Sequence, residues 1–110
     1  MANANIMKII SDKTFSDVLQ SSSKPVVILF TTSYSGLSKI MMPRIEEVGR
    51  HFADKIDLYN APCEDSKNFI ARFGIRVVPT IAIFKNNALV GIRVNVISKE
   101  QLISFINSQI

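Results

Sequence analysis

The sequence predicts an α/β domain in which a mixed sheet lies between helices. Residues 26–30 (Val-Val-Ile-Leu-Phe) are five consecutive apolar residues, which is typical of a central parallel strand covered on both faces. Residues 77–84 and 89–94 are two further strand candidates, joined by Lys85-Asn86-Asn87-Ala88. Because asparagine tolerates the positive φ of a tight turn, this pair predicts an antiparallel hairpin.

The first half of the chain predicts strand, helix, strand and helix in that order. Residues 7–10 form a short strand, and Ser11 or Asp12 can cap the helix that follows. Residues 35–52 carry apolar side chains at helical spacing after the buried strand 26–30. Pro43 lies inside this helix and is expected to kink it, because proline removes a backbone donor. The first helix has three apolar residues on one face: Phe15, Val18 and Leu19.

The second half of the chain completes the order βαβαβαββα in one domain spanning residues 1–110. Residues 56–59 alternate like a strand with one polar side. Asp65 or Ser66 can cap a short helix, and Gly74 stands where a left-handed C-terminal cap is expected. Ser98-Lys99-Glu100-Gln101 is a capping box that begins the closing helix after the hairpin.

Composition and charge narrow the class of protein. The chain has 110 residues, 47% of them hydrophobic, and contains no apolar stretch near the roughly 18 residues that a membrane span needs. Its 13 basic residues include no adjacent pair, whereas nucleic-acid binders usually concentrate such charge. One cysteine and no secretion signal suit a reducing compartment. We therefore expect a cytoplasmic protein with neither a membrane nor a nucleic acid as partner.

Several segments, in the same order and spacing, resemble the thioredoxin family. Residues 34–39 (Tyr-Ser-Gly-Leu-Ser-Lys) are similar to the active-site segment Trp-Cys-Gly-Pro-Cys-Lys, and Pro43 matches the proline of the active-site helix. Residues 73–80 are similar to the segment that ends beside the family's cis-proline, which falls on Pro79. Residues 84–87 and 98–102 match the hairpin and the closing helix. The resemblance implies a thioredoxin fold, with a mixed central sheet flanked by helices on both faces.

Serine occupies both positions that the family uses for its redox cysteines, Ser35 and Ser38. In the family, a thiol at the N-terminus of a helix is acidified by the helix dipole, and the second thiol resolves the mixed disulfide. A serine hydroxyl cannot be oxidised to a disulfide, so the chain as written is redox-inactive. The resemblance implies a protein-disulfide reductase only for a parent with cysteines at 35 and 38, served by a reductant of the thioredoxin-reductase kind.

Supporting positions of the family also differ in this chain. Its buried aspartate falls on Leu29, its lysine partner falls near Asn60, and its two tryptophans fall on Thr31 and Tyr34. A family glycine corresponds to Asn95. Two explanations stay open: the cysteines of a working protein were deliberately replaced by serine, or the chain is a natural relative that has lost redox activity.

The resemblance also implies a groove for protein or peptide substrates beside Pro79. In the family, the backbone before this proline pairs with an extended peptide, and such strand addition requires no thiol. The alternative function is therefore a non-enzymatic peptide- or protein-binding module. A plainer interpretation is that Pro79 only fixes the shape of its loop. The expected substrate-binding residues are Tyr34, Gly36, Leu37, Val78, Pro79 and Thr80.

Other chemistries find little support in the residues. His51 lies 16 residues beyond Ser35 on one helix, or about 24 Å at 1.5 Å per residue, which excludes a Ser-His couple. We expect no metal site, because the chain has one cysteine, one histidine and scattered carboxylates. We also expect no bound cofactor, because the sequence contains no glycine-rich phosphate-binding loop. Cys63 is expected to be a partly buried structural thiol; a reactive monothiol is the alternative, which the flanking Glu64 and Asp65 disfavour by raising its pKa.

Overall fold

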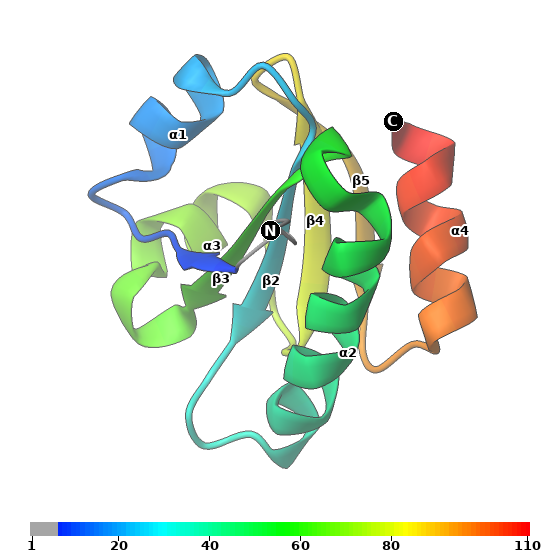
Figure 1. Cartoon of the computed structure of the whole chain (residues 1–110). Helices are drawn as coiled ribbons and strands as arrows, with labels where there is room; N and C mark the ends of the chain where they lie inside the picture. The colour runs from blue at the N-terminus through cyan, green and yellow to red at the C-terminus, as the bar shows by residue number, and fades with distance from the viewer. Residues whose placement is uncertain (1–6) are drawn as a thin grey trace.

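The structure, a computed structural model, describes residues 7–110. Within these residues the elements follow the predicted order (Figure 1). Two single turns of 3-10 helix, Ala53–Lys55 and Cys63–Asp65, flank β3. The strands are β1 (Lys8–Ile9), β2 (Val26–Thr31), β3 (Asp57–Pro62), β4 (Thr80–Lys85) and β5 (Ala88–Val94). The helices are α1 (Phe15–Ser21), α2 (Gly36–Phe52), α3 (Lys67–Phe73) and α4 (Lys99–Gln109).

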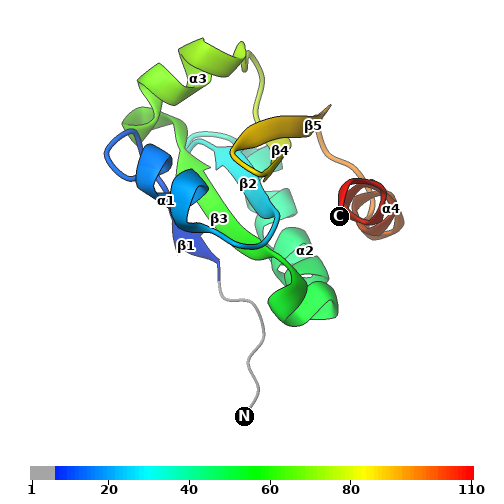
Figure 2. The same ribbon diagram turned by 90° about the horizontal axis from the view of Figure 1, so that it is seen from above.

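The five strands form one mixed sheet in the order β1-β3-β2-β4-β5. The first three strands of that order are parallel, β4 runs antiparallel to β2, and β5 runs antiparallel to β4. Helices α2 and α4 cover one face, while α1 and α3 cover the other (Figures 1 and 2). This arrangement is the thioredoxin fold that the resemblance implies.

The sheet separates two apolar cores, and β2 contributes to both because its side chains alternate between faces. Val27 and Leu29 pack against α2 and α4, and Ile28 and Phe30 pack toward α1 and α3. Every residue of β2 is buried, as the unbroken apolar run predicts. Full burial of such a side chain stabilises the fold by roughly 1.5–3 kcal/mol relative to exposure.

Local signals placed several boundaries correctly. Asn86 and Asn87 both have positive φ, at 53° and 65°, and form the expected tight turn. Gly74 is left-handed at the end of α3, and the capping box of Ser98 and Gln101 is complete at the start of α4. Pro43 lies inside α2, which continues unbroken to Phe52.

One predicted helix cap was wrong, and a second was right in position but makes no side-chain capping bond. The N-cap of α1 is Thr14, and neither Ser11 nor Asp12 caps that helix. The carboxylate of Asp12 instead accepts hydrogen bonds from the backbone N–H groups of Asn68 and Phe69, at 3.0 and 2.9 Å, and thereby caps α3. Ser66 is the N-cap residue of α3, but its hydroxyl makes no capping bond, because the Asp12 carboxylate already holds the free N–H groups.

Two strand boundaries also differ from the expected ones. The fourth strand begins at Thr80, three residues later than the apolar run starting at Val77, because the chain turns through Pro79 before it enters the sheet. The third strand extends to Pro62, since it pairs with β2 along its whole length.

Among residues 7–110, no helix combines the length and apolar character needed to cross a membrane.

Candidate functional site

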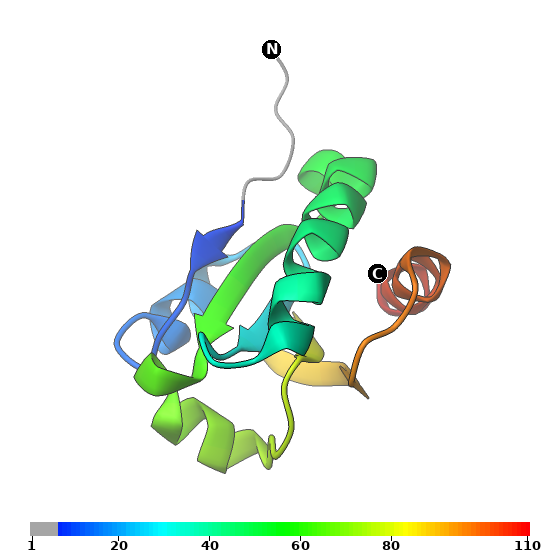
Figure 3. The ribbon, with the colours of Figure 1, turned by 90° about the horizontal axis from the view of Figure 1, so that it is seen from below.

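The candidate site lies at the end of the sheet where β2 leads into α2. The register pairs Phe30 of β2 with Thr80 of β4, so the loop Thr32–Ser35 and the segment Val78–Pro79 leave neighbouring strands at the same edge. Figure 3 views the molecule from this side. The structure therefore brings together the two segments that the sequence identified separately.

Ser35 is the N-cap residue of α2. Its hydroxyl oxygen accepts a hydrogen bond from the backbone N–H of Ser38 at 3.1 Å, which satisfies one of the free donors at the helix start. Ser38 is buried, and its own hydroxyl oxygen accepts from the N–H of Thr32 at 3.4 Å. Both serine hydroxyls thus serve to hold the corner between strand and helix.

Glu64 holds the same loop from the other side, a role that the sequence analysis missed. One carboxylate oxygen accepts from the hydroxyls of Thr32 and Ser33, at 2.8 and 3.1 Å, and from the N–H of Ser33 at 3.4 Å. Its own backbone N–H and the Thr32 hydroxyl hold the pKa of Glu64 below its usual value. The sequence contains no local sign of these bonds, because Thr32 and Ser33 are 32 and 31 residues from Glu64.

Beneath the loop, neutral residues fill the positions that the family uses for proton handling. Leu29 is fully buried and lies opposite Asn60 in the pairing of β2 with β3. The Thr31 hydroxyl donates to the side-chain oxygen of Asn60 at 2.7 Å in a buried hydrogen bond. No ionisable side chain stands at either position, so the proton relay implied by the resemblance has no counterpart at Leu29 and Asn60.

Pro79 is buried, and its peptide bond with Val78 is cis. The Pro79 carbonyl accepts from the N–H of Asn95 at 2.9 Å, and the Thr80 hydroxyl donates to the carbonyl of Val77 at 2.6 Å. Neither the N–H nor the C=O of Val78 bonds to any other residue in the range 7–110. The backbone before Pro79 therefore has a free donor and a free acceptor, as strand addition requires.

Large apolar side chains are exposed at this same end of the sheet. Tyr34 is 91% exposed, and Leu37 and Val77 are about half exposed, at 48% and 43%. Gly36 is also exposed, whereas Val78 is half-buried against the core under α1 and α3. Thr80 is buried, so its side chain is not part of this surface. The resemblance implies a groove here, and we call the surface of Tyr34, Leu37, Val77 and Val78 the Pro79 groove.

Asn95 directly follows β5, and its backbone N–H bonds to Pro79. The resemblance implies glycine at this position. Asn95 adopts a left-handed conformation with a φ of 69°, which asparagine tolerates better than most residues. The backbone conformation of a glycine is thus retained, and a polar side chain is added at the rim of the groove.

Cys63 and His51 take no part in a catalytic arrangement. Cys63 is half-buried and packs against the core under α1 and α3; burial, followed by the neighbouring Glu64 carboxylate, raises the pKa of its thiol. His51 is exposed near the C-terminal end of α2, with its ring against Phe52. Within residues 7–110, no group of three His, Cys, Asp or Glu side chains could hold a metal ion.

Comparisons with known proteins cover nearly the whole chain. The family model named Thioredoxin matches residues 6–108. The thioredoxins of Haemophilus influenzae and Acidithiobacillus ferridurans are each 32% identical over 101 residues, which is 92% of this chain and 94% of theirs. The thioredoxin of Rickettsia prowazekii is 27% identical over the same share of this chain and 96% of its own. The chain therefore belongs to the thioredoxin family of thiol–disulfide oxidoreductases.

Proposed function

We propose that this chain is a redox-inactive member of the thioredoxin family that binds extended protein segments in the Pro79 groove. The observation that carries the proposal is the contrast within one site. Ser35 and Ser38 hold the corner of the helix by hydrogen bonds and cannot form a disulfide. The N–H and C=O of Val78 are unpaired among the described residues, and apolar side chains at the same end of the sheet are exposed.

The absence of redox activity follows from the chemistry of the residues. Thiol–disulfide exchange needs an attacking thiolate and a second thiol that resolves the mixed disulfide. The chain has a single cysteine, Cys63, whose pKa is raised, so little of it is thiolate at neutral pH. Leu29 and Asn60 provide no acid or base near the serines. A standard insulin reduction assay on this chain should therefore give no turnover.

Binding of a peptide depends on groups that the serines do not affect. An extended segment can pair with the N–H and C=O of Val78, while its alternate side chains contact Tyr34 and Leu37. Exposed aromatic and aliphatic residues at the centre of such a surface usually supply most of the binding free energy. The polar side chain of Asn95 at the rim narrows the groove and restricts which segments fit.

The test is selection of peptides from a displayed library of extended sequences, followed by affinity measurements on the selected peptides. Leu37→Glu and Pro79→Ala should each weaken binding by about tenfold or more, since they alter the centre of the surface. Val90→Glu is the matched control, because Val90 is an exposed apolar residue of β5 that lies outside the Pro79 groove. Equal affinities for the unmodified chain, Leu37→Glu and Pro79→Ala would refute the proposed groove.

A second candidate function is disulfide reduction by a form with cysteines at positions 35 and 38. It is favoured by the match to thioredoxins over 92% of the chain. The double variant Ser35→Cys, Ser38→Cys, supplied with dithiothreitol or with a thioredoxin reductase and NADPH, separates the two candidates. Vigorous insulin reduction supports a reductase whose cysteines were replaced, whereas continued inactivity supports the binding module. The reducing cytoplasm suits both candidates.

A further inference from the structure

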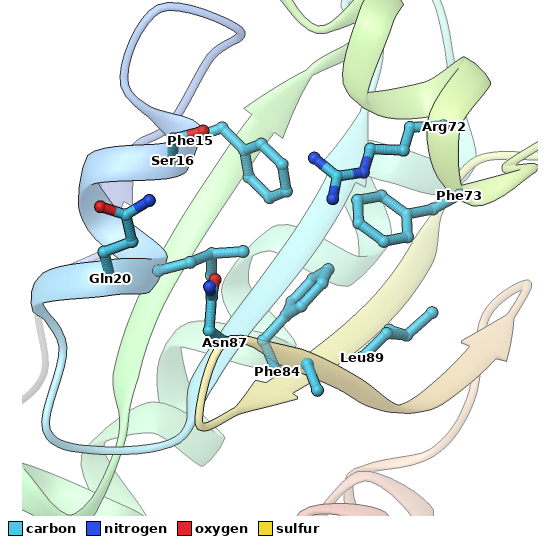
Figure 4. Close-up of a pocket in the computed structure, with 10 residues that line it drawn as sticks. Phe15, Ser16, Gln20, Arg72, Phe73, Phe84, Asn87 and Leu89 are labelled. Carbon is cyan, nitrogen blue, oxygen red and sulfur yellow. The ribbon is translucent and has the colours of Figure 1, made fainter.

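A second hollow lies at the opposite end of the sheet from the Pro79 groove. It is a pocket of about 250 Å³ between α1, the end of α3 and the β4–β5 hairpin (Figure 4). Phe84 forms part of its wall and pairs with Val26 at the start of β2, whereas the Pro79 groove adjoins the end of β2. None of the residues implicated in redox chemistry or peptide binding contributes to this pocket, which we call the hairpin pocket.

Three phenylalanine rings form one side of the hairpin pocket. The centroid of the Phe15 ring lies 5.6 Å from that of Phe73 and 6.0 Å from that of Phe84, and the Phe73 and Phe84 centroids are 5.2 Å apart. All three pairs meet edge to face, which is a preferred geometry for aromatic rings. Phe15 and Phe84 are also buried in the core, so the wall is rigid before any ligand binds.

A single cation faces these rings. The guanidinium carbon of Arg72 lies 5.2 Å from the centroid of Phe73 and 5.8 Å from that of Phe15, and Figure 4 shows the group reaching between the two rings. No carboxylate within residues 7–110 forms an ion pair with Arg72. Its planar fork of N–H donors therefore lies at an aromatic wall and is not paired with a carboxylate of the described residues.

We propose that the hairpin pocket binds a small aromatic carboxylate. The ring of the ligand would pack on Phe73 and Leu89, the lining residues that keep exposed apolar surface above the buried rings of Phe15 and Phe84. Its carboxylate would accept paired hydrogen bonds from Arg72. The amides of Gln20 and Asn87 lie at the rim, as Figure 4 shows, and can bond to polar substituents. A pocket of about 250 Å³ is smaller than the usual range for drug-sized ligands, so a molecule with one ring is expected.

The test is a titration of the full chain with 3-phenylpropionate, followed by amide chemical shifts in NMR spectra. We expect saturable shifts at Phe15, Phe73 and Leu89, which line the pocket. The neutral analogue 3-phenylpropanamide should bind about tenfold more weakly, because it cannot form the charge-assisted pair with Arg72. The comparison of acid with amide tests the proposal on the unmodified protein.

A pair of arginine variants sharpens the test. Arg72→Gln should lower the affinity for 3-phenylpropionate to that for the amide, whereas Arg76→Gln, an equally exposed arginine outside the hairpin pocket, should leave it unchanged. Shifts that do not saturate, equal affinity for acid and amide, or equal binding by Arg72→Gln in a variant with a native spectrum would each overturn the proposal. Because this pocket is separate from the Pro79 groove, its failure would leave the proposed function untouched.

Discussion

The Ser35 hydroxyl caps the start of α2. It satisfies the N–H of Ser38 at 3.1 Å, one of the four N–H groups that the start of α2 leaves without a helical partner. A cysteine at this position would keep the size of the side chain but be a weaker acceptor. Serine is therefore the better cap for this helix.

Ser35→Ala should accordingly lower the free energy of unfolding by about 1 kcal/mol, the usual cost of losing a serine cap. Chemical denaturation at neutral pH measures this change. Ser23→Ala, at an exposed position before β2, serves as the control and should change stability by less than about 0.5 kcal/mol. Equal effects of the two variants would mean that the Ser35 hydroxyl contributes nothing to α2.

Glu64 makes the loop of the candidate site sensitive to acid. Its pKa is lower in the folded chain than the ordinary 4.5, so the stability that it contributes is present above pH 4.5 and is lost as pH falls through the folded pKa. Protonation leaves fewer acceptor sites for Thr32 and Ser33, because one carboxylate oxygen then carries the proton.

The amide resonances of Thr32 and Ser33 should therefore titrate with a midpoint below pH 4.5, which NMR spectra recorded across that range would reveal. Glu64→Gln should abolish this titration. Glu47→Gln is the matched control, since Glu47 also has a lowered pKa but bonds to Lys99 on α4. A midpoint at or above pH 4.5, or one that persists in Glu64→Gln, would refute the role of Glu64.

Among the elements, α3 depends on a residue that precedes a different helix. Asp12 bonds to the N–H groups of Asn68 and Phe69 and so joins the loop before α1 to the start of α3. Asp12→Ala should lower the free energy of unfolding by about 1–2 kcal/mol, as for the loss of a carboxylate cap. Asp65→Ala, at one of the two positions that the local sequence offered as a cap, should cost less. Thermal or urea denaturation compares the two variants, and a larger loss in Asp65→Ala would contradict the cap by Asp12.

These elements also show which parts of the structure could be read from the sequence. The capping box of Ser98, the Asn86-Asn87 turn and Gly74 act on residues within a few positions, so the local sequence predicted them correctly. Bonds between distant segments could not be predicted in this way. The Asp12 carboxylate and the N–H of Phe69 are 57 residues apart, and a local reading assigned that carboxylate to the wrong helix.

In the candidate site, too, the features that the sequence predicted are local, and the bonds between distant residues were not predicted. The resemblance located Ser35, Ser38 and Pro79, because family motifs are contiguous in sequence. It did not predict the bonds from Glu64 to the loop, nor the hydrogen bond between Thr31 and Asn60, because these join side chains 29 to 32 residues apart. The sequence thus identified which positions of the site differ from the family, and the structure was needed to show what the side chains there bond to.

At the scale of the whole molecule, the spacing between the sheet and α4 depends on one glycine. Gly91 in β5 faces α4, and a Cβ at this position would lie 2.9 Å from the Phe105 ring and 3.2 Å from two carbon atoms of Gln109. Phe105 is buried in the core that the sheet shares with α2 and α4, so its ring has little room to move. A methyl group at Gly91 would therefore push α4 away from the sheet and loosen the core that both share with α2.

Gly91→Ala should lower the free energy of unfolding by about 1–3 kcal/mol, the usual cost of overpacking a core. Gly36→Ala is the opposite case, because no atom lies within 4 Å of the place that its Cβ would occupy and alanine favours the helix. That variant should leave stability unchanged or raise it. Adding Gln109→Ala to Gly91→Ala should recover part of the loss by removing one of the two contacts. Urea denaturation of the unmodified chain and the three variants measures these differences. A harmless Gly91→Ala would show that Gly91 does not set the distance of α4 from the sheet.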